Sequence, residues 1–185
     1  MRDKNILMVD LVGQYDKIKD EINQNIINSL HEGKFINGPI VKEFSQNLSN
    51  FLNVKHVIPC ANGTDALEIA IKSLNLPENS EIITQSNTFY STCSAIVNNN
   101  CKLVLADINP ETYMIDVNKL ENYITEKTKV IIPVHLYGHS ADMDKILEIA
   151  QKYNLYIIED CAQAQGCLYK GKKVGSIGNI GCFSF

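Results

Sequence analysis

Side chains suited to binding a ligand stand directly after apolar stretches that are typical of buried strands. Gly63 and Thr64 open a helical pattern, where free N–H groups and the positive end of the helix dipole attract an anion such as phosphate. Asp160 follows the expected strand 155–159, and a carboxylate there needs a cation or a hydrogen-bond donor opposite it. A protonated ring nitrogen would meet that need.

Further polar and aromatic residues follow expected strands: Gln163 follows the same strand as Asp160, and Phe89 and Tyr90 follow the strand 81–84. Gln163 could direct an amide N–H at a phenolic oxygen, and Phe89 or Tyr90 could stack on a flat ring. His135 and Ser184 each stand at the end of another strand. Because ligands of an open α/β sheet bind at the carboxyl ends of its strands, these groups together describe a phosphopyridine site, and pyridoxal 5′-phosphate (PLP) fits it best.

Several of these residues also have a purely structural explanation. Thr64 is a good N-cap, and Asp160 could cap a following helix. The aromatic residues could fill core, and a lone His135 is more often a satisfied buried residue than a base. The motifs GxGxxG and GxxxxGK[ST] do not occur, which argues against Rossmann dinucleotide binding and P-loop hydrolysis.

Strand and helix patterns alternate from residue 55 onward. Strands are expected at 56–59, 81–84, 102–106, 130–134, 155–159 and 180–183. Helices are expected at 64–74, 91–98, 117–123 and 143–153. This alternation predicts an α/β fold, a three-layer α/β/α sandwich with a mostly parallel sheet.

Two earlier helical patterns predict an N-terminal helical arm over residues 1–54, ahead of one α/β domain over residues 55–185. The first runs from Tyr15 to His31 and stops at Gly33; the second starts at Pro39. The basic segment 170–173 predicts a solvated hairpin turn.

Composition excludes several classes of protein. The chain has 185 residues, 45% of them hydrophobic, and a net charge of −4 with a single arginine, so nucleic acid is not an expected partner. Residues 1–5 do not resemble a signal peptide, and no apolar run is long enough for a membrane span. The six cysteines show no Cys-x-x-Cys spacing, which predicts neither a metal site nor disulfides but buried thiols in the cytoplasm.

Six motifs occur in order at 35–39, 62–67, 88–89, 131–138, 158–163 and 181–185. With them the chain resembles the DegT/DnrJ/EryC1/StrS aminotransferases, the sugar-aminotransferase branch of fold-type-I PLP enzymes, from about residue 35 to the end. The resemblance implies that Gly63, Thr64 and Ser184 hold the cofactor phosphate. It also implies that Phe89 stacks on the pyridine ring and that Asp160 pairs with the protonated ring nitrogen.

The resemblance further implies that Gln163 contacts the ring hydroxyl. The expected activity is transfer of an amino group, usually from glutamate, to a nucleotide-linked ketosugar, by a homodimer that uses no metal. Residues 55–185 would form the PLP-binding large domain.

The family's Schiff-base lysine stands about five residues after the serine, so it is expected past Phe185 and no catalytic residue is expected within the chain. The strand that normally lies between the first and last strands, and the small C-terminal domain, would also be missing. The chain is therefore expected to be the N-terminal part of an aminotransferase, inactive alone. Two alternatives stay open: a non-catalytic PLP- or partner-binding fragment, and a dehydratase in which histidine replaces the lysine.

Overall fold

A computed structural model describes residues 8–185; the residues on which the expectation about a signal peptide rests lie outside this range. The chain divides into two compact units, and the boundary along the chain falls between Leu48 and Ser49. No helix in the described range is long and apolar enough to cross a bilayer.

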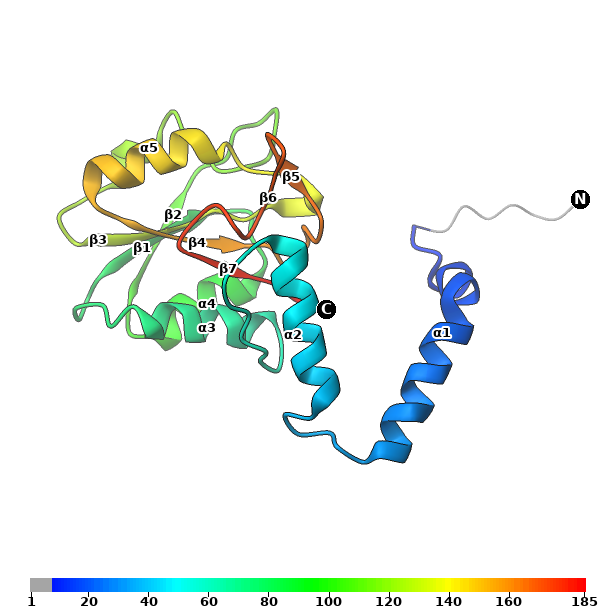
Figure 1. Cartoon of the computed structure of the whole chain (residues 1–185). Helices are drawn as coiled ribbons and strands as arrows, with labels where there is room; N and C mark the ends of the chain where they lie inside the picture. Colours follow the sequence, from blue (N-terminus) through cyan, green and yellow to red (C-terminus); the bar gives the residue numbers. More distant parts are fainter. Residues whose placement is uncertain (1–7) are drawn as a thin grey trace, which may run out of the picture. The chain divides into compact units, whose positions relative to one another are not determined.

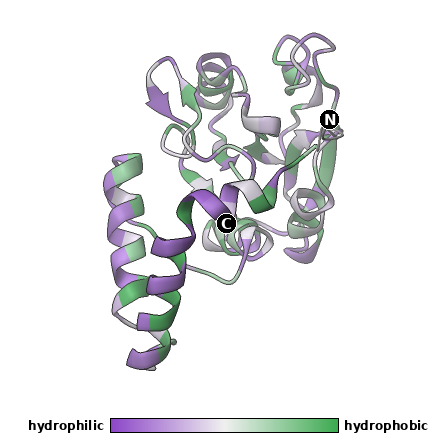
Figure 2. Ribbon diagram, turned by 90° about the vertical axis from the view of Figure 1, so that its right-hand side faces the viewer, coloured by the Kyte–Doolittle hydropathy of each residue, from purple (hydrophilic) through white to green (hydrophobic). Residues whose placement is uncertain are grey.

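The first unit contains helix α1 (Leu11–Glu32) and most of α2 (Pro39–Leu52). Helix α1 starts after Asp10, whose carboxylate accepts the Gly13 N–H at 2.9 Å, and ends at Gly33 in the left-handed conformation (φ 64°). Both helices were predicted, as was the stop at the glycine. Hydrophobic and hydrophilic residues are mixed along α1 (Figure 2). None of the side chains of this helix is buried.

The second unit is built on a five-stranded sheet with the order β2-β1-β3-β4-β7, and every neighbouring pair of strands is parallel. The strands are β1 (Glu81–Gln85), β2 (Lys102–Ala106), β3 (Thr128–Ile132), β4 (Tyr156–Asp160) and β7 (Ile180–Cys182). The predicted parallel sheet is confirmed.

Helices cover both faces of this sheet (Figure 1). On one face lie α3 (Gly63–Ser73) and α4 (Tyr90–Asn98), and on the other lies α5 (Met143–Tyr153). Alternate strand residues point to opposite faces, so the strands need apolar side chains on both sides. Ile82, Val130, Ile132 and Ile158 pack with Leu67, Ile71 and Ile96 of α3 and α4.

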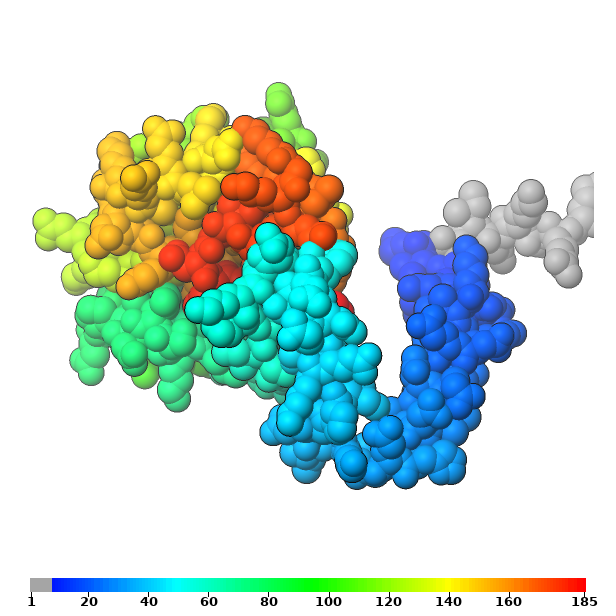
Figure 3. Space-filling model, viewed as in Figure 1, coloured from blue at the N-terminus to red at the C-terminus, as the bar shows by residue number. Residues whose placement is uncertain are grey.

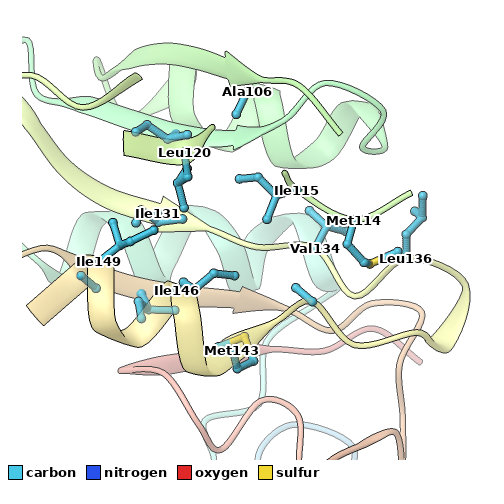
Figure 4. Close-up of a cluster of buried hydrophobic side chains, with 14 residues drawn as sticks. Ala106, Met114, Ile115, Leu120, Ile131, Val134, Leu136, Met143, Ile146 and Ile149 are labelled. Carbon is cyan, nitrogen blue, oxygen red and sulfur yellow. The ribbon is translucent and has the colours of Figure 1, made fainter. Parts of the chain in front are cut away.

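The opposite core lies between the sheet and α5 (Figure 4). Ile83, Ile131 and Ile157 share this cluster with Met143 and Ile146 of the helix. Each fully buried side chain of this size contributes about 1.5–3 kcal/mol to folding. These two cores make the three-layer sandwich and hold the carboxyl ends of the strands at one edge.

Three predicted elements differ in the structure. Residues 56–59 form no strand, because the sheet in the described range places no strand beside them to bond their N–H and C=O groups. Residues 117–123 contain only the 3₁₀ turn η1 (Leu120–Tyr123), held by i→i+3 bonds such as that from the Asn122 N–H to the Lys119 carbonyl. Strand β3 stops at Ile132 rather than at residue 134, because Pro133 has no N–H to donate.

The basic segment forms the predicted hairpin. Strands β5 (Leu168–Tyr169) and β6 (Lys172–Lys173) pair antiparallel around Lys170 and Gly171, which both have positive φ.

All six cysteines are free. Cys161 and Cys182 are buried, as predicted, and burial raises the pKa of the Cys182 thiol to about 12. Cys60 is exposed, so the expectation of buried thiols is wrong for that residue.

Glu81 starts β1, at the end of the sheet opposite to the carboxyl edge, and its buried carboxylate accepts hydrogen bonds from Lys102 (2.8 Å) and Thr125 (2.6 Å). These bonds lower its pKa. The carboxylate therefore stabilises the fold above its unfolded pKa of about 4.3, and this contribution is lost as the pH falls through the lower folded value.

We expect Glu81→Gln to lower the free energy of unfolding at pH 7 by about 1–3 kcal/mol, because two donors lose a charged acceptor. Urea unfolding at neutral and acid pH measures this, and the difference from the wild type should shrink in acid. Glu148→Gln, at an exposed carboxylate of α5, is the control. A difference of the same size at both pH values would contradict the assignment.

Candidate cofactor site

The first turn of α3 lies at the carboxyl edge of the sheet, where its free N–H groups could bind an anion. Asn62, not Thr64, caps this helix, because its side chain accepts the Asp65 N–H at 2.9 Å. The capping explanation for Thr64 is therefore wrong, and its hydroxyl instead donates to Ser91 Oγ at 2.8 Å. The N–H groups of Gly63 and Thr64 belong to the first turn, where the helix itself supplies no acceptor.

Ser184 lies against this turn. A Cβ atom placed on Gly63 would be 2.9 Å from the Cβ and 3.3 Å from the Oγ of Ser184. Glycine is therefore required at position 63 for the segment after β7 to approach the helix. The structure thus brings together the three residues expected at the phosphate, although Ser184 lies 120 positions after Thr64 in the chain.

Asp160, the last residue of β4, is buried at 5% exposure. Its Oδ2 accepts the Thr92 hydroxyl at 2.7 Å and its Oδ1 accepts the Ala162 N–H at 3.2 Å. Burial outweighs these bonds and raises the pKa of the carboxyl group. No helix follows this residue, so the capping explanation is wrong. A buried carboxyl with neutral donors only is suited to receive a cation.

Helix α4 connects the two ends of the site. Its consecutive residues Ser91 and Thr92 contact Thr64 and Asp160 respectively, at 2.8 and 2.7 Å. The first turn of α3 and the buried carboxyl group are thus linked through two neighbouring side chains of α4. Ser91 and Thr92 were not among the predicted site residues, and the only signal for them is a run of hydroxyl residues after β1.

Gln163 is held with a defined amide orientation. Its Oε1 accepts the backbone N–H of Tyr137 at 2.9 Å, so the oxygen end faces η2 (Leu136–Gly138) and the NH₂ group remains a donor. Tyr137 adopts a left-handed backbone (φ 56°), which is unfavourable for an aromatic residue and is common at functional sites. The expected donation from Gln163 to a ring hydroxyl fits this orientation.

Phe89 and Tyr90 lie at the N-terminus of α4 with exposures of 69% and 77%. Neither fills core, so that explanation is wrong, and both leave an aromatic surface accessible. His135 is the opposite case, because it is fully buried and both its ring nitrogens have partners. The expectation of a satisfied buried histidine is confirmed.

The raised pKa of Asp160 has a measurable consequence for cofactor-free protein. Because the fold disfavours the ionised form, folding stability is lost as the pH rises through the raised pKa, whereas below about pH 4 the folded and unfolded carboxyl groups are both protonated. We therefore expect Asp160→Asn to stabilise cofactor-free protein at pH 7.5 but not at acid pH, as thermal unfolding would show. A less stable variant at pH 7.5 would contradict this.

A parallel α/β sandwich of this kind is the fold of the PLP-dependent transferases, and solved enzymes of that class share it. A profile of the DegT/DnrJ/EryC1/StrS aminotransferase family matches residues 16–185. The chain belongs to this family.

Individual relatives agree with this membership. The chain is 43% identical over 180 residues to the UDP-2-acetamido-2-deoxy-3-oxo-D-glucuronate aminotransferase of Pseudomonas aeruginosa, covering 97% of this chain and 50% of the relative. A DegT/DnrJ/EryC1/StrS aminotransferase from Brucella abortus superimposes with a TM-score of 0.91 at 33% identity, covering 98% and 50% of the two chains.

A third relative carries the cofactor. NtdA of Bacillus subtilis, solved with pyridoxamine phosphate bound, superimposes with a TM-score of 0.84 at 35% identity, covering 98% of this chain and 42% of that one. The chain spans about half the length of the curated relatives it matches.

Proposed function

We propose that this chain binds PLP and forms the cofactor-binding part of an aminotransferase that acts on nucleotide-linked ketosugars. The observation that carries the proposal is the link from the α3 turn through Ser91 and Thr92 to the buried Asp160. This link supports placing the cofactor phosphate at the α3 turn and the protonated ring nitrogen at Asp160. The family membership and the activity named for the Pseudomonas relative support the substrate class.

The phosphate end is proposed to use the backbone of Gly63 and Thr64 and the hydroxyls of Thr64 and Ser184. The helix N-terminus contributes N–H donors and a positive dipole end that favour an anion. The Ser184 hydroxyl would join these groups, because Ser184 lies against Gly63.

The ring end is proposed to use Asp160, Gln163 and Phe89. Asp160 would hold the proton on the ring nitrogen. The positive charge of that nitrogen would in turn stabilise the ionised carboxylate, which burial disfavours in the cofactor-free protein. Gln163 would donate to the ring hydroxyl, and Phe89 would cover one face of the ring. When bound, the cofactor supplies the electron sink for moving a proton at the substrate carbon.

The remaining parts of the activity are proposed to come from beyond this chain. The Schiff-base lysine is expected after Phe185, residues 1–54 would form a helical arm, and residues 55–185 would form the PLP-binding domain. We propose glutamate as amino donor and a homodimer as the active assembly.

The test has two steps. Purified protein is titrated with PLP, and the absorbance change of the bound cofactor should saturate at one equivalent per chain. A full-length protein that includes the lysine should then transfer the amino group of glutamate to a UDP- or dTDP-linked ketosugar. Failure to bind PLP would overturn the proposal. Binding without transfer by the full-length protein would favour the non-catalytic alternative, and loss of a sugar hydroxyl would favour the dehydratase.

A further inference from the structure

Glu159 is a fully buried carboxylate beside the proposed site, and it accepts four hydrogen bonds. Its Oε2 accepts from His135 Nε2 at 3.0 Å and from the Gly175 N–H at 2.8 Å. Its Oε1 accepts from the N–H groups of Ile177 (2.8 Å) and Gly178 (2.7 Å). Burial acts to raise its pKa, but the donors outweigh burial and the pKa is lowered. The buried group is therefore ionised.

The histidine proton in this cluster is assigned by its neighbours. His135 Nδ1 accepts the Ala141 N–H at 3.1 Å, so the ring proton is on Nε2 and is donated to Glu159. Cys161 has its sulfur within 4.8 Å of these ligand atoms, a grouping that could hold a metal ion. However, each carboxylate oxygen already accepts two hydrogen bonds, and Nδ1 accepts one. The geometry therefore points to a structural role for the carboxylate.

The three backbone donors belong to the loop that leads into β7. This segment, red in Figure 3, lies at the surface between α5 and α3. Gly175, at φ 84°, packs directly on the ring of Phe183, and no side chain would fit between them. Asn179 secures the end of the loop to Ile157 of β4 by two hydrogen bonds of 2.8 and 2.9 Å. Phe183 is followed by Ser184, which packs on the α3 turn. A continuous series of contacts therefore runs from Glu159 to the proposed phosphate site.

We propose that Glu159 is a positioning residue for the cofactor phosphate: by binding the N–H groups of the 175–178 loop, it sets the path of β7 and hence the place of Ser184. This inference rests on the proposed function. It separates the roles of two adjacent residues of β4, since Asp160 would serve the ring nitrogen and Glu159 the opposite end of the cofactor.

The test compares affinities for PLP and for pyridoxal, which differ only in the phosphate. In Glu159→Gln the amide NH₂ cannot accept from the loop N–H groups, so we expect the preference for PLP over pyridoxal to fall roughly tenfold. Ser184→Ala should also reduce the preference for PLP over pyridoxal, because it removes a hydroxyl proposed to bind the phosphate. Glu81→Gln is the matched control, because it alters a buried carboxylate at the far end of the sheet and should leave the preference unchanged.

The outcomes separate the two proposals. If wild-type protein does not bind PLP, the proposed function fails and this inference fails with it. If wild-type protein binds PLP but Glu159→Gln weakens both ligands equally, only the inference is overturned. If Glu159→Gln does not fold, His135→Asn is the second variant, because its shorter side chain can still accept the Ala141 N–H but does not reach Glu159, so one of the four donors is lost. It should give a smaller loss of PLP preference with faster hydrogen exchange at Gly175; an unchanged preference would likewise overturn the inference.

Discussion

Asp160→Asn in the full-length protein is expected to lower the rate of amino transfer by about 10²–10³-fold. The carboxylate can hold a proton on the ring nitrogen by its charge, whereas the neutral amide cannot. The described residues that bond to Asp160 cannot replace its charge, because Thr92 and Ala162 are both neutral donors. Single-turnover kinetics with glutamate as donor measures the effect on the chemical step.

The matched control for this change is Asp116→Asn. Asp116 is buried to a similar degree, at 6% exposure, but its partners are the Asn118 N–H and Lys119. This control should retain turnover. The combination of slow turnover with greater stability of the cofactor-free protein at pH 7.5 would be specific to Asp160, because a general packing defect lowers both. Turnover close to the wild-type rate would remove Asp160 from the proposed role.

The second large effect is expected from Gly63→Ala. The added methyl group would meet the Cβ of Ser184 at 2.9 Å, so either the α3 turn or the segment after β7 must move. Overpacking of this kind costs about 1–3 kcal/mol, and a displacement of both phosphate-binding elements should weaken PLP binding by about 5- to 150-fold. Equilibrium titration with PLP measures the affinity, and urea unfolding measures the stability.

A double variant tests whether this clash is the cause. Ser184→Gly removes the Cβ that the new methyl group would contact, so the Gly63→Ala/Ser184→Gly protein should regain stability relative to Gly63→Ala. It should not regain full PLP affinity, because the hydroxyl is absent. Additive effects of the two substitutions on stability would show that the residues do not contact each other in the folded protein.

The repeating elements could be predicted because their signals are local. Alternating apolar strands and helices identified the parallel α/β sandwich, and the left-handed stop at Gly33 and the hairpin at Lys170 follow from residue type alone. The predictions failed where a partner elsewhere in the chain decides the outcome. Residues 56–59 have a strand pattern, but no neighbouring strand in the described range bonds to them.

The same division holds for the candidate site. Residue types and their place after strands were sufficient to nominate Gly63, Thr64, Phe89, Asp160, Gln163 and Ser184. Residue types could not show that Asn62 rather than Thr64 caps α3, nor that Ser91 and Thr92 connect the two ends of the site. They also did not indicate that Glu159 binds the loop before β7.

By itself, then, the sequence determined the fold class, the family and the chemical types available at the sheet edge, since periodicity and motif order are properties of the chain. Only the tertiary structure decided which hydroxyl meets which carboxylate and where Gly63 must lack a side chain. Those contacts join residues far apart in the sequence, and their geometry depends on how helices and strands pack rather than on the preference of any single residue.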